Sequence, residues 1–473
     1  MSCQHVTPEG QPCLLQDHLS DFYTTNGRNS FCIYHLPNNK GGNIDGDRSA
    51  WLDDRVNEFN EGLCELIGVV KRANEVLDMQ GCIFPAGLEV TEEVLPECNF
   101  SRSIFLGDIS FNGSVFTSKA TFDVVKIAGD CDFSSVGFKG DFLLTGSTIG
   151  GELLLLSTKC KSMATFSGLE INNSMHATEA VFESAFVCVG STIGGYSNFN
   201  DVKFNGTTTF LNTRFSFVTF NDVVAVDSFW LNGVEVADYF SSLRSVFNSG
   251  FNMDGSKNRR ELSSVDFSDA RFEDGASFMN RDFLGSTTFD RCMFRKAPKF
   301  HNTTLHQDTG FEDIAFKDTS KEAARSYRTL KQAMESVRSR REEGMFFALE
   351  QRCLRNNKSI SASVRFLSWL YDATSSYGQS TMKPVYWMIG ILTIFACVYA
   401  YLLSPVISMG ASFDFGILKD AFAMSIKQAV TPFYIWKENS ELTISLFGTL
   451  QSILFLGMFA LFLLAIRWRF KRG

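Results

Sequence analysis

Large apolar residues recur along the middle of the chain at a fixed spacing. From Phe100 an apolar residue stands at every eleventh position up to Phe210, and a second series follows five residues behind, from Phe105 to Phe215. The spacing therefore alternates between five and six residues. We call these positions the Phe ladder, and after an irregular stretch it resumes in a shifted phase at Phe267, Phe272, Phe278, Phe283, Phe289, Phe294, Phe300, Leu305, Phe311 and Phe316.

The ladder predicts a mainly β protein built as a β-solenoid. An 11-residue period also fits a right-handed coiled coil, but the segment is rich in Gly, Ser, Thr, Asn and Asp, which are poor helix formers. The sequence 146–151 recurs as 190–195, which is four periods later and supports the register. Residues two positions before a ladder Phe are mostly small, such as Ser103, Ala120 and Ala276. One large and one small residue on each side would fill a narrow tube, so the ladder is expected to be core.

These alternating large and small positions resemble those of the pentapeptide-repeat family. The resemblance covers about 98–318 and implies a right-handed quadrilateral β-helix with a large and a small residue pointing inward on each face. This sequence departs from the family pattern because alternate faces carry six residues, so a coil would hold 22 residues, and because 221–264 breaks the phase. Roughly ten coils at a strand spacing of ~4.8 Å would form a rod about 45 to 50 Å long. The polar, turn-rich 252–260 predicts a bulge or side loop at the break.

The segments around the solenoid set the domain boundaries. Residues 1–48 form an N-terminal segment, and 49–97 contain an amphipathic helix over 49–77 that is expected to cap the first coil. The solenoid spans 98–318. A basic helical neck at 319–383 begins with a helix from Ser320 to about Arg355, broken near Gly344, and ends with an interfacial helix at 364–371. A membrane domain occupies 384–473.

The N-terminal segment carries a candidate metal site formed by Cys3, Cys13, Cys32 and His35. The two-residue gap between Cys32 and His35 lets both side chains point into one site, and four soft ligands suit tetrahedral Zn²⁺. The segment has too few apolar residues to fold without a bound metal ion. We therefore predict a closed, structural zinc site, with His5 and His18 as substitute ligands. The alternative is a set of unrelated thiols in a reducing cytosol.

Two apolar segments meet the criterion for membrane helices. Residues 384–403 and 442–466 contain no charge and measure 20 and 25 residues. Lys383 precedes the first, and four cations follow the second, so both termini are expected on the cytoplasmic side of the cell inner membrane in a multi-pass arrangement. The four cations are Arg467, Arg469, Lys471 and Arg472. The stretch 1–37 has no apolar core after a basic start, so the part before the membrane is expected to stay in the cytosol.

The loop between these segments suggests more than an anchor. Residues 413–436 are too charged to span a bilayer, yet they carry an apolar stripe that would suit a re-entrant half-helix. Residues 370–473 resemble the two-helix ion-channel domains appended to some bacterial pentapeptide-repeat proteins, although the potassium-filter sequence TVGYG is absent. The candidate pore-lining residues are Ser445, Thr449, Gln451 and Ser452. Alternatively, these polar groups hold helix to helix in a plain anchor.

Charge and motifs narrow the function classes. The 473-residue chain has a net charge of -8, with 19 basic and 27 acidic residues in 97–318 but 12 basic and 6 acidic in 321–383. An acidic body does not favour binding to nucleic acid. The sequence contains no P-loop, GxSxG, HExxH or Rossmann motif, so an enzyme is not expected.

The leading interpretation is a cytosolic sensor or scaffold rod coupled to a pore-like membrane domain. Its partners would be the lipid bilayer, further copies of the chain in a homo-oligomer, and a cytosolic protein or ligand on the solenoid. By analogy alone, such an architecture suits an ion-conducting effector in a stress or antiviral response. Two alternatives are a non-conducting, membrane-anchored interaction scaffold and a DNA-mimicking regulator of a nucleoid enzyme.

Overall fold

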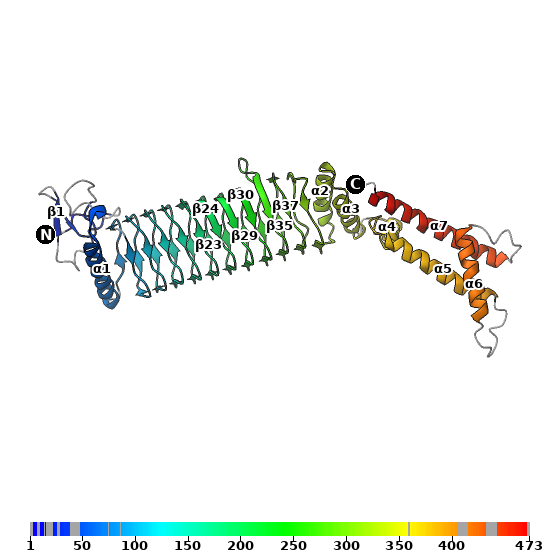
Figure 1. Cartoon of the computed structure of the whole chain (residues 1–473), viewed down its shortest axis with the longest axis horizontal. Coiled ribbons are helices and arrows are strands. Elements are labelled where there is room, and N and C mark those ends of the chain that lie inside the picture. The colour runs from blue at the N-terminus through cyan, green and yellow to red at the C-terminus, as the bar shows by residue number, and fades with distance from the viewer. Residues whose placement is uncertain are drawn as a thin grey trace. The chain divides into compact units, whose positions relative to one another are not determined.

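The computed structural model divides the chain into two compact units, Met1–Asp318 and Thr319–Gly473. It describes residues 3–6, 10–13, 15, 22–25, 29–37, 48–73, 75–85, 87–357, 360–403, 415–431 and 442–470. The first unit contains a β-hairpin, helix α1 and a long stack of short strands, and the second is built from helices α2 to α7 (Figure 1).

The strands of the first unit form a parallel β-solenoid of about 11 turns, as predicted. The first sheet comprises β3 (Leu77–Asp78), β7 (Cys98–Asn99), β11 (Ala120–Thr121), β15 (Phe142–Leu143), β19 (Ala164–Thr165), β23 (Phe186–Val187), β26 (Thr208–Thr209), β29 (Phe229–Trp230), β32 (Phe251–Asn252) and β35 (Ala276–Ser277). The second comprises β6 (Val94–Leu95), β10 (Val115–Phe116), β14 (Gly137–Phe138), β18 (Lys159–Cys160), β22 (Val181–Phe182), β25 (Lys203–Phe204), β28 (Val224–Ala225), β31 (Val246–Phe247), β34 (Arg271–Phe272), β38 (Met293–Phe294) and β40 (Ala315–Phe316).

The third sheet is wider because two strands of each turn join it. It comprises β4 (Ile83–Phe84), β5 (Leu88–Glu89), β8 (Ile104–Phe105), β9 (Ile109–Ser110), β12 (Lys126–Ile127), β13 (Cys131–Asp132), β16 (Thr148–Ile149), β17 (Leu153–Leu154), β20 (Glu170–Ile171), β21 (Met175–His176), β24 (Thr192–Asn198), β27 (Arg214–Thr219), β30 (Glu235–Ser241), β33 (Glu261–Asp266), β36 (Asp282–Phe283), β37 (Thr287–Thr288) and β39 (Thr309–Gly310). In β24, β27, β30 and β33 the two strands are continuous. The solenoid starts at β3, before the position 98 at which the repeat was expected to begin.

The Phe ladder forms the core of the solenoid. Its side chains are buried from Phe100 to Phe311, and only the last, Phe316, is half-buried. Rings of successive turns stack nearly parallel: the ring centroids of Phe100 and Phe122 are 4.9 Å apart, and those of Phe116 and Phe138 are 5.0 Å apart. Strand partners lie 22 residues apart, as Ala120 beside Phe142 shows, so the predicted coil length is confirmed.

The small inward residues bridge one turn to the next. The hydroxyl of Ser147 donates to the Phe122 carbonyl at 2.8 Å and accepts from the Val125 amide at 3.0 Å. Thr158 and Ser191 donate in the same way to Phe133 and Phe166. Because a buried hydroxyl is costly unless it is hydrogen-bonded, these contacts explain how Ser and Thr share the small positions with Ala.

The phase break at 221–264 is a change of turn length and not an interruption. Phe204 pairs with Ala225, one residue short of the usual turn, whereas Phe251 pairs with Ala276, three residues beyond it. The extra residues form a side loop within 252–260 that is closed by an antiparallel bridge between Ser256 and Arg259, as expected from its composition.

A buried arginine fills the inside of this enlarged turn. Arg281 stands at a small position of the ladder yet is fully buried. Its guanidinium donates to the carbonyls of Met253 at 2.6 Å, Val234 at 2.8 Å and Leu231 at 3.1 Å. Burial lowers the pKa of Arg281 to about 10. The Arg259 carbonyl, at 3.4 Å, is a fourth acceptor, and these four carbonyls hold the cation inside an apolar tube.

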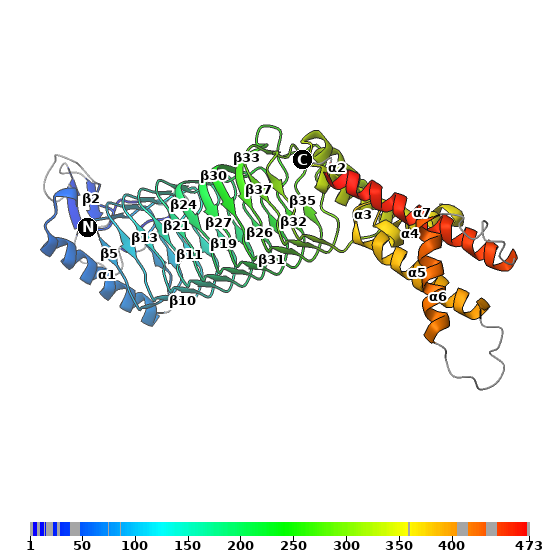
Figure 2. The same ribbon diagram turned by 45° about the vertical axis from the view of Figure 1, so that its right-hand side comes forward.

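Helix α1 (Asp53–Ala73) covers the first turn of the solenoid (Figure 2). Its buried face carries Phe59, Leu63 and Val70, and the Phe59 ring meets the Phe84 ring edge-on at 6.0 Å. The Asn60 amide donates to the Gly87 carbonyl at 2.8 Å. The predicted capping helix is thus present and covers apolar side chains at the open end.

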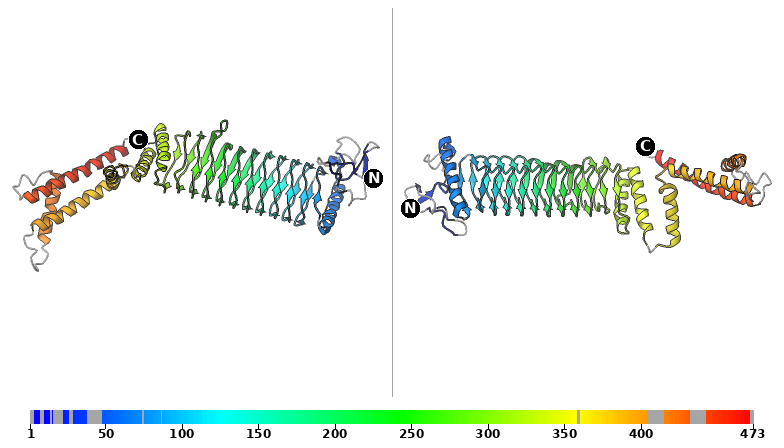
Figure 3. Two further views of the ribbon diagram at one scale, coloured as in Figure 1. Left: turned by 180° about the vertical axis from the view of Figure 1, so that it is seen from behind. Right: turned by 90° about the horizontal axis from the view of Figure 1, so that it is seen from below.

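The second unit contains α2 (Ala323–Ser336), α3 (Arg340–Arg355), α4 (Ala362–Ser375), α5 (Met382–Leu403), α6 (Phe415–Val430) and α7 (Leu442–Phe470) (Figure 3). The predicted break at Gly344 is wrong: the helix is interrupted near Arg338, whose φ is 61°, and Gly344 lies inside α3. The terminal amide of the Gln379 side chain lies over Gly344, and a side chain at 344 would displace that amide.

Helices α5 and α7 are long and apolar enough to cross a membrane. They lie side by side in Figure 1, and α6 contacts both of them. Helix α6 falls within the predicted re-entrant segment, of which 413–414 and 432–436 lie outside the described residues, as do Lys471 and Arg472.

Replacing ladder residues by alanine should destabilise the solenoid. Phe122→Ala, Phe204→Ala and Phe289→Ala each remove a buried ring, so each should lower the free energy of unfolding by ~3 to 5 kcal/mol. The exposed control Lys119→Ala should change it by less than about 0.5 kcal/mol. Denaturant unfolding followed by circular dichroism measures both, and equal tolerance at the two kinds of site would contradict the assigned register.

Candidate metal centre

The candidate metal ligands come together through a hairpin and a tight turn. Strands β1 (Phe22–Thr25) and β2 (Asn29–Cys32) pair antiparallel, and Cys32 pairs with Phe22 at the end of the hairpin away from its turn. The His35 amide donates to the Cys32 carbonyl at 3.1 Å, which turns His35 back toward Cys32. The Cys32 amide donates to the Cys3 sulfur at 3.4 Å, and the Gln4 amide donates to the Ser30 carbonyl, so residues 3–6 lie beside β2. We call this assembly, residues 3–36, the knuckle.

All four predicted ligands meet in one buried cluster. The Sγ atoms of Cys3, Cys13 and Cys32 and a ring nitrogen of His35 lie within 4.8 Å of one another. His35 Nδ1 is 3.2 Å from Cys32 Sγ, 3.3 Å from Cys13 Sγ and 3.8 Å from Cys3 Sγ. Ligand bonds of about 2.0 to 2.3 Å in a tetrahedron place ligand atoms about 3.3 to 3.8 Å apart, so the three distances from His35 Nδ1 are close to those around a bound metal ion.

The other nitrogen of His35 is held by the solenoid. His35 Nε2 lies 2.9 Å from the Gln80 carbonyl oxygen, which can only accept, so Nε2 carries the proton and donates. In the neutral ring this tautomer directs the lone pair of Nδ1 at the three thiols, whereas in the protonated ring Nδ1 donates to them. A backbone carbonyl in this position is the usual outer-shell partner of a metal-binding histidine.

The thiols of the cluster do not ionise independently. Hydrogen bonds with Cys13 and Cys32 lower the pKa of Cys3 well below its usual range, while the same contacts raise the pKa of Cys32. Burial lowers the pKa of His35, but the neighbouring Cys82 and the hydrogen-bonded thiols outweigh it and raise the value to about 12. Within the cluster, negative charge is therefore favoured on Cys3 and positive charge on His35.

Other candidate ligands lie outside the cluster. The ring of His5 stacks on that of His35 at 3.8 Å, so it packs on the outer side of a ligand. Burial lowers the pKa of His5. His18 lies outside the described residues. Cys82 Sγ is 3.4 Å from His35 Nε2, on the side of the ring that faces away from the other thiols.

The knuckle is joined to the first turn of the solenoid. The Ile83 amide donates to the Tyr34 carbonyl at 2.9 Å, and the guanidinium of Arg48 donates to the carbonyls of Ile33 and Leu36. Arg48 is itself buried and lies over the ring of Trp51 at 5.5 Å. Sequence spacing did not reveal Gln80, Cys82 or Arg48, because these residues belong to segments remote from the knuckle.

The candidate pore-lining residues lie in α7 with different surroundings. Gln451 and Ser452 are buried within the chain: Gln451 Nε2 donates to Ser425 Oγ at 2.8 Å, and Gln428 Nε2 donates to Ser452 Oγ at 2.6 Å. Both thus face α6. Ser445 is buried as well, and Thr449, which is half-exposed, donates to the Ser445 carbonyl of its own helix at 2.9 Å. A pore-lining role for these residues stays a prediction.

Comparisons with protein families, curated proteins and solved structures yield no match to this chain. The fold and the site define a β-solenoid protein with a cysteine-histidine cluster near the N-terminus and two helices of membrane-spanning length near the C-terminus.

The purified protein should contain about one metal ion per chain, held by the cluster. Cys32→Ser removes a ligand, so the metal content measured by mass spectrometry of the digested protein should fall close to zero. Cys64→Ser is the matched control, because Cys64 is exposed on α1 and lies outside the cluster. Equal metal content in the two variants would contradict the site.

Removing the metal should loosen the knuckle but not the solenoid. The knuckle has few apolar residues of its own, so its order depends on the metal, whereas the solenoid is held by the Phe ladder. After treatment with a chelator, limited proteolysis should cleave within 3–36 while the segment from Leu77 onward stays protected. Cleavage spread evenly over both segments, or unchanged protection of the knuckle, would show that the two are not separable in this way.

Proposed function

We propose that this chain is a bacterial inner-membrane protein in which a cytosolic sensor or scaffold rod is coupled to an oligomeric, pore-like membrane domain. In this proposal α5 and α7 span the bilayer with both chain termini in the cytoplasm. The cations Lys383 and Arg467 at the ends of these helices support that orientation. Most side chains of both helices are not buried within the chain, as expected for helices whose solvent is lipid.

The observation that carries the proposal is helix α6 and the way it is held. Helix α6 bears the charges of Lys419, Asp420 and Lys427 and is amphipathic, so it does not span the bilayer by itself. A buried network binds it to both long helices: Ser425 Oγ donates to the Leu392 carbonyl of α5 at 2.9 Å, and Gln451 of α7 donates to Ser425. A plain two-helix anchor has no use for a third helix of this kind. In an oligomeric pore, α6 would serve as the re-entrant segment.

The cytosolic part completes the proposal. We infer that the solenoid is a right-handed, four-sided coil of the pentapeptide-repeat type and that the metal of the knuckle is structural Zn²⁺. Three thiolates and one imidazole are a common zinc-ligand set, and four protein ligands leave no open position for catalysis. A protein or ligand bound to the rod would shift a closed-to-open equilibrium of the membrane domain.

The second candidate function is a non-conducting, membrane-anchored interaction scaffold. The polar groups of Gln451 and Ser452 favour it, because within one chain these groups bond to α6 and are not left for a water-filled lumen. Tyr399 adds a further bond of this kind, from its hydroxyl to Gln451 Oε1 at 2.8 Å. The two candidates differ in one measurable property, which is conduction.

Overexpression should depolarise cells if the membrane domain conducts. Thr449→Leu should abolish the depolarisation measured with a potential-sensitive dye, because a pore lumen does not tolerate leucine while lipid does. Leu450→Ile, at the neighbouring lipid-exposed position, should have no effect. Membrane insertion of both variants is verified by extraction at alkaline pH.

Exchange of 384–466 for an unrelated two-helix hairpin provides the opposite test. If the exchanged protein retains every phenotype, or if the wild type does not depolarise cells, the pore proposal is wrong and the scaffold proposal stands. Equal depolarisation in Thr449→Leu and the wild type would remove only Thr449 from the pore lining.

A further inference from the structure

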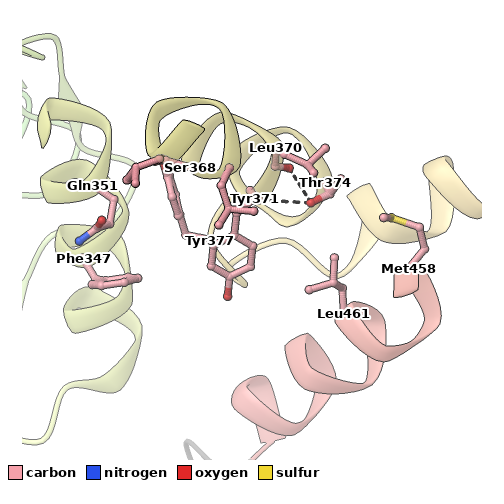
Figure 4. Close-up of a pocket in the computed structure, with 11 residues that line it drawn as sticks. Phe347, Gln351, Ser368, Leu370, Tyr371, Thr374, Tyr377, Met458 and Leu461 are labelled. Carbon is pink, nitrogen blue, oxygen red and sulfur yellow. Dashed lines mark hydrogen bonds between the residues drawn. The ribbon is translucent and has the colours of Figure 1, made fainter. Parts of the chain in front are cut away.

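The second unit contains a cavity of about 520 Å³ between α3, α4 and α7 (Figure 4). Its wall includes Phe347 of α3, Leu367 and Tyr371 of α4, and Met458 and Leu461 of α7. The volume falls within the range of about 300 to 1,000 Å³ that is usual for small-molecule sites. None of these residues belongs to the metal centre or to the candidate pore lining.

The chemistry of the wall favours an apolar occupant. The hydroxyls of Ser368 and Tyr377 lie 2.8 Å apart and bond to each other. The Thr374 hydroxyl donates to the Leu370 carbonyl at 2.7 Å, as Figure 4 shows. These polar groups are satisfied within the chain, and the remaining wall is mainly hydrocarbon. A hydrocarbon chain therefore fits the cavity better than a polar metabolite.

The cavity opens beside an exposed apolar surface on α4. Four apolar residues of α4 each expose half or more of their surface: Val364, Phe366, Leu367 and Trp369. Exposing so much apolar surface on one short helix to water is unfavourable. An amphipathic helix with such residues beside a spanning helix lies in the interface of a bilayer. Lipid tails would then reach the cavity directly from the membrane next to α7.

The charges around the cavity favour a negatively charged head group. Arg365 lies one helical turn before Ser368, and within the described part of the chain its Nε atom is buried without a hydrogen-bond partner. The nearby Arg352 and Arg355 both bond to Asp372, each at 3.0 Å. Two arginines thus share the Asp372 carboxylate, whereas Arg365 forms no ion pair within the described residues. A lipid phosphate would supply an anion to Arg365 by a charge-assisted hydrogen bond.

We propose that this cavity binds one acyl chain of an anionic phospholipid, with the lipid phosphate next to Arg365. The inference rests on the membrane insertion of α5 and α7 in the proposed function but not on conduction. Because the cavity is walled by α3, α4 and α7 together, the bound lipid would hold the neck helices to the second spanning helix. The anionic lipid content of the membrane would then influence how rigidly the neck is attached.

A photoreactive residue in the cavity tests the proposal. The full-length protein, with a diazirine-bearing aliphatic amino acid in place of Leu461, is reconstituted in vesicles of equal parts phosphatidylglycerol and phosphatidylcholine. After irradiation, the mass of the intact protein identifies the adduct. We expect an adduct of one phospholipid with phosphatidylglycerol favoured about fivefold, which one arginine near the phosphate provides. The same residue at Leu463, exposed on α7 outside the cavity, should label both lipids in proportion to their abundance.

A second variant tests the contact with the head group. Arg365→Gln should reduce the lipid preference at 461 to that at 463, while Arg325→Gln, an exposed position on α2, should leave it unchanged. Equal preference for phosphatidylglycerol at 461 and 463, in the protein without an arginine substitution, would overturn the proposal. A covalent protein dimer in place of a lipid adduct would also overturn it and would assign the cavity to a second copy of the chain. Extraction at alkaline pH distinguishes failure of the proposed function from failure of this inference. A protein that leaves the membrane refutes both, whereas an inserted protein without selective labelling refutes this inference alone.

Discussion

Parallel pairing of successive turns over a narrow aromatic core is the interaction on which the first unit depends. Each turn presents a few large side chains to the interior, and these stack on their counterparts one turn away, as Phe272 does on Phe294 at 4.7 Å. Every inward position therefore touches only its neighbours in the stack, so stability is a sum of local contacts. This explains why the stack continues through one turn that is short by a residue and another enlarged by three, with the register shifts confined to the third sheet.

Because each turn contacts only its neighbours, the two terminal turns of the solenoid are its least stable parts. A terminal turn has a partner on one side only and would expose both unpaired strands and aromatic rings. Helix α1 covers the rings at the N-terminal end, and the knuckle contributes a backbone hydrogen bond from Ile83 to Tyr34. The Cys-His cluster is therefore part of the cap, because His35 is oriented by a carbonyl of the first turn. In the proposed function, binding of a metal ion would be coupled to folding of the knuckle.

The second unit is held together by a different kind of contact. Lipid gives two apolar helices little reason to associate, so polar contacts between them carry weight. The network of Tyr399, Ser425, Gln428 and Gln451 joins α5, α6 and α7 into one unit. The apolar cavity between α3, α4 and α7 belongs to the same unit, and its wall is mainly hydrocarbon. Polar groups inside and charges at the ends are the arrangement expected where one part of a protein meets lipid and the other meets water.

The sequence by itself determined the solenoid, its register, the four ligands of the metal cluster and the extents of the apolar helices, because each depends on a local period or spacing. An inward position must be large wherever it recurs, so the pattern of Phe122 and its counterparts is visible without a structure. Only the tertiary structure decided which remote groups complete these sites. The carbonyl of Gln80 orients His35, Arg281 is buried where a small residue was expected, and Gln451 faces α6. These contacts join residues far apart in the chain, and no spacing rule encodes a contact that arises only when separate elements pack together.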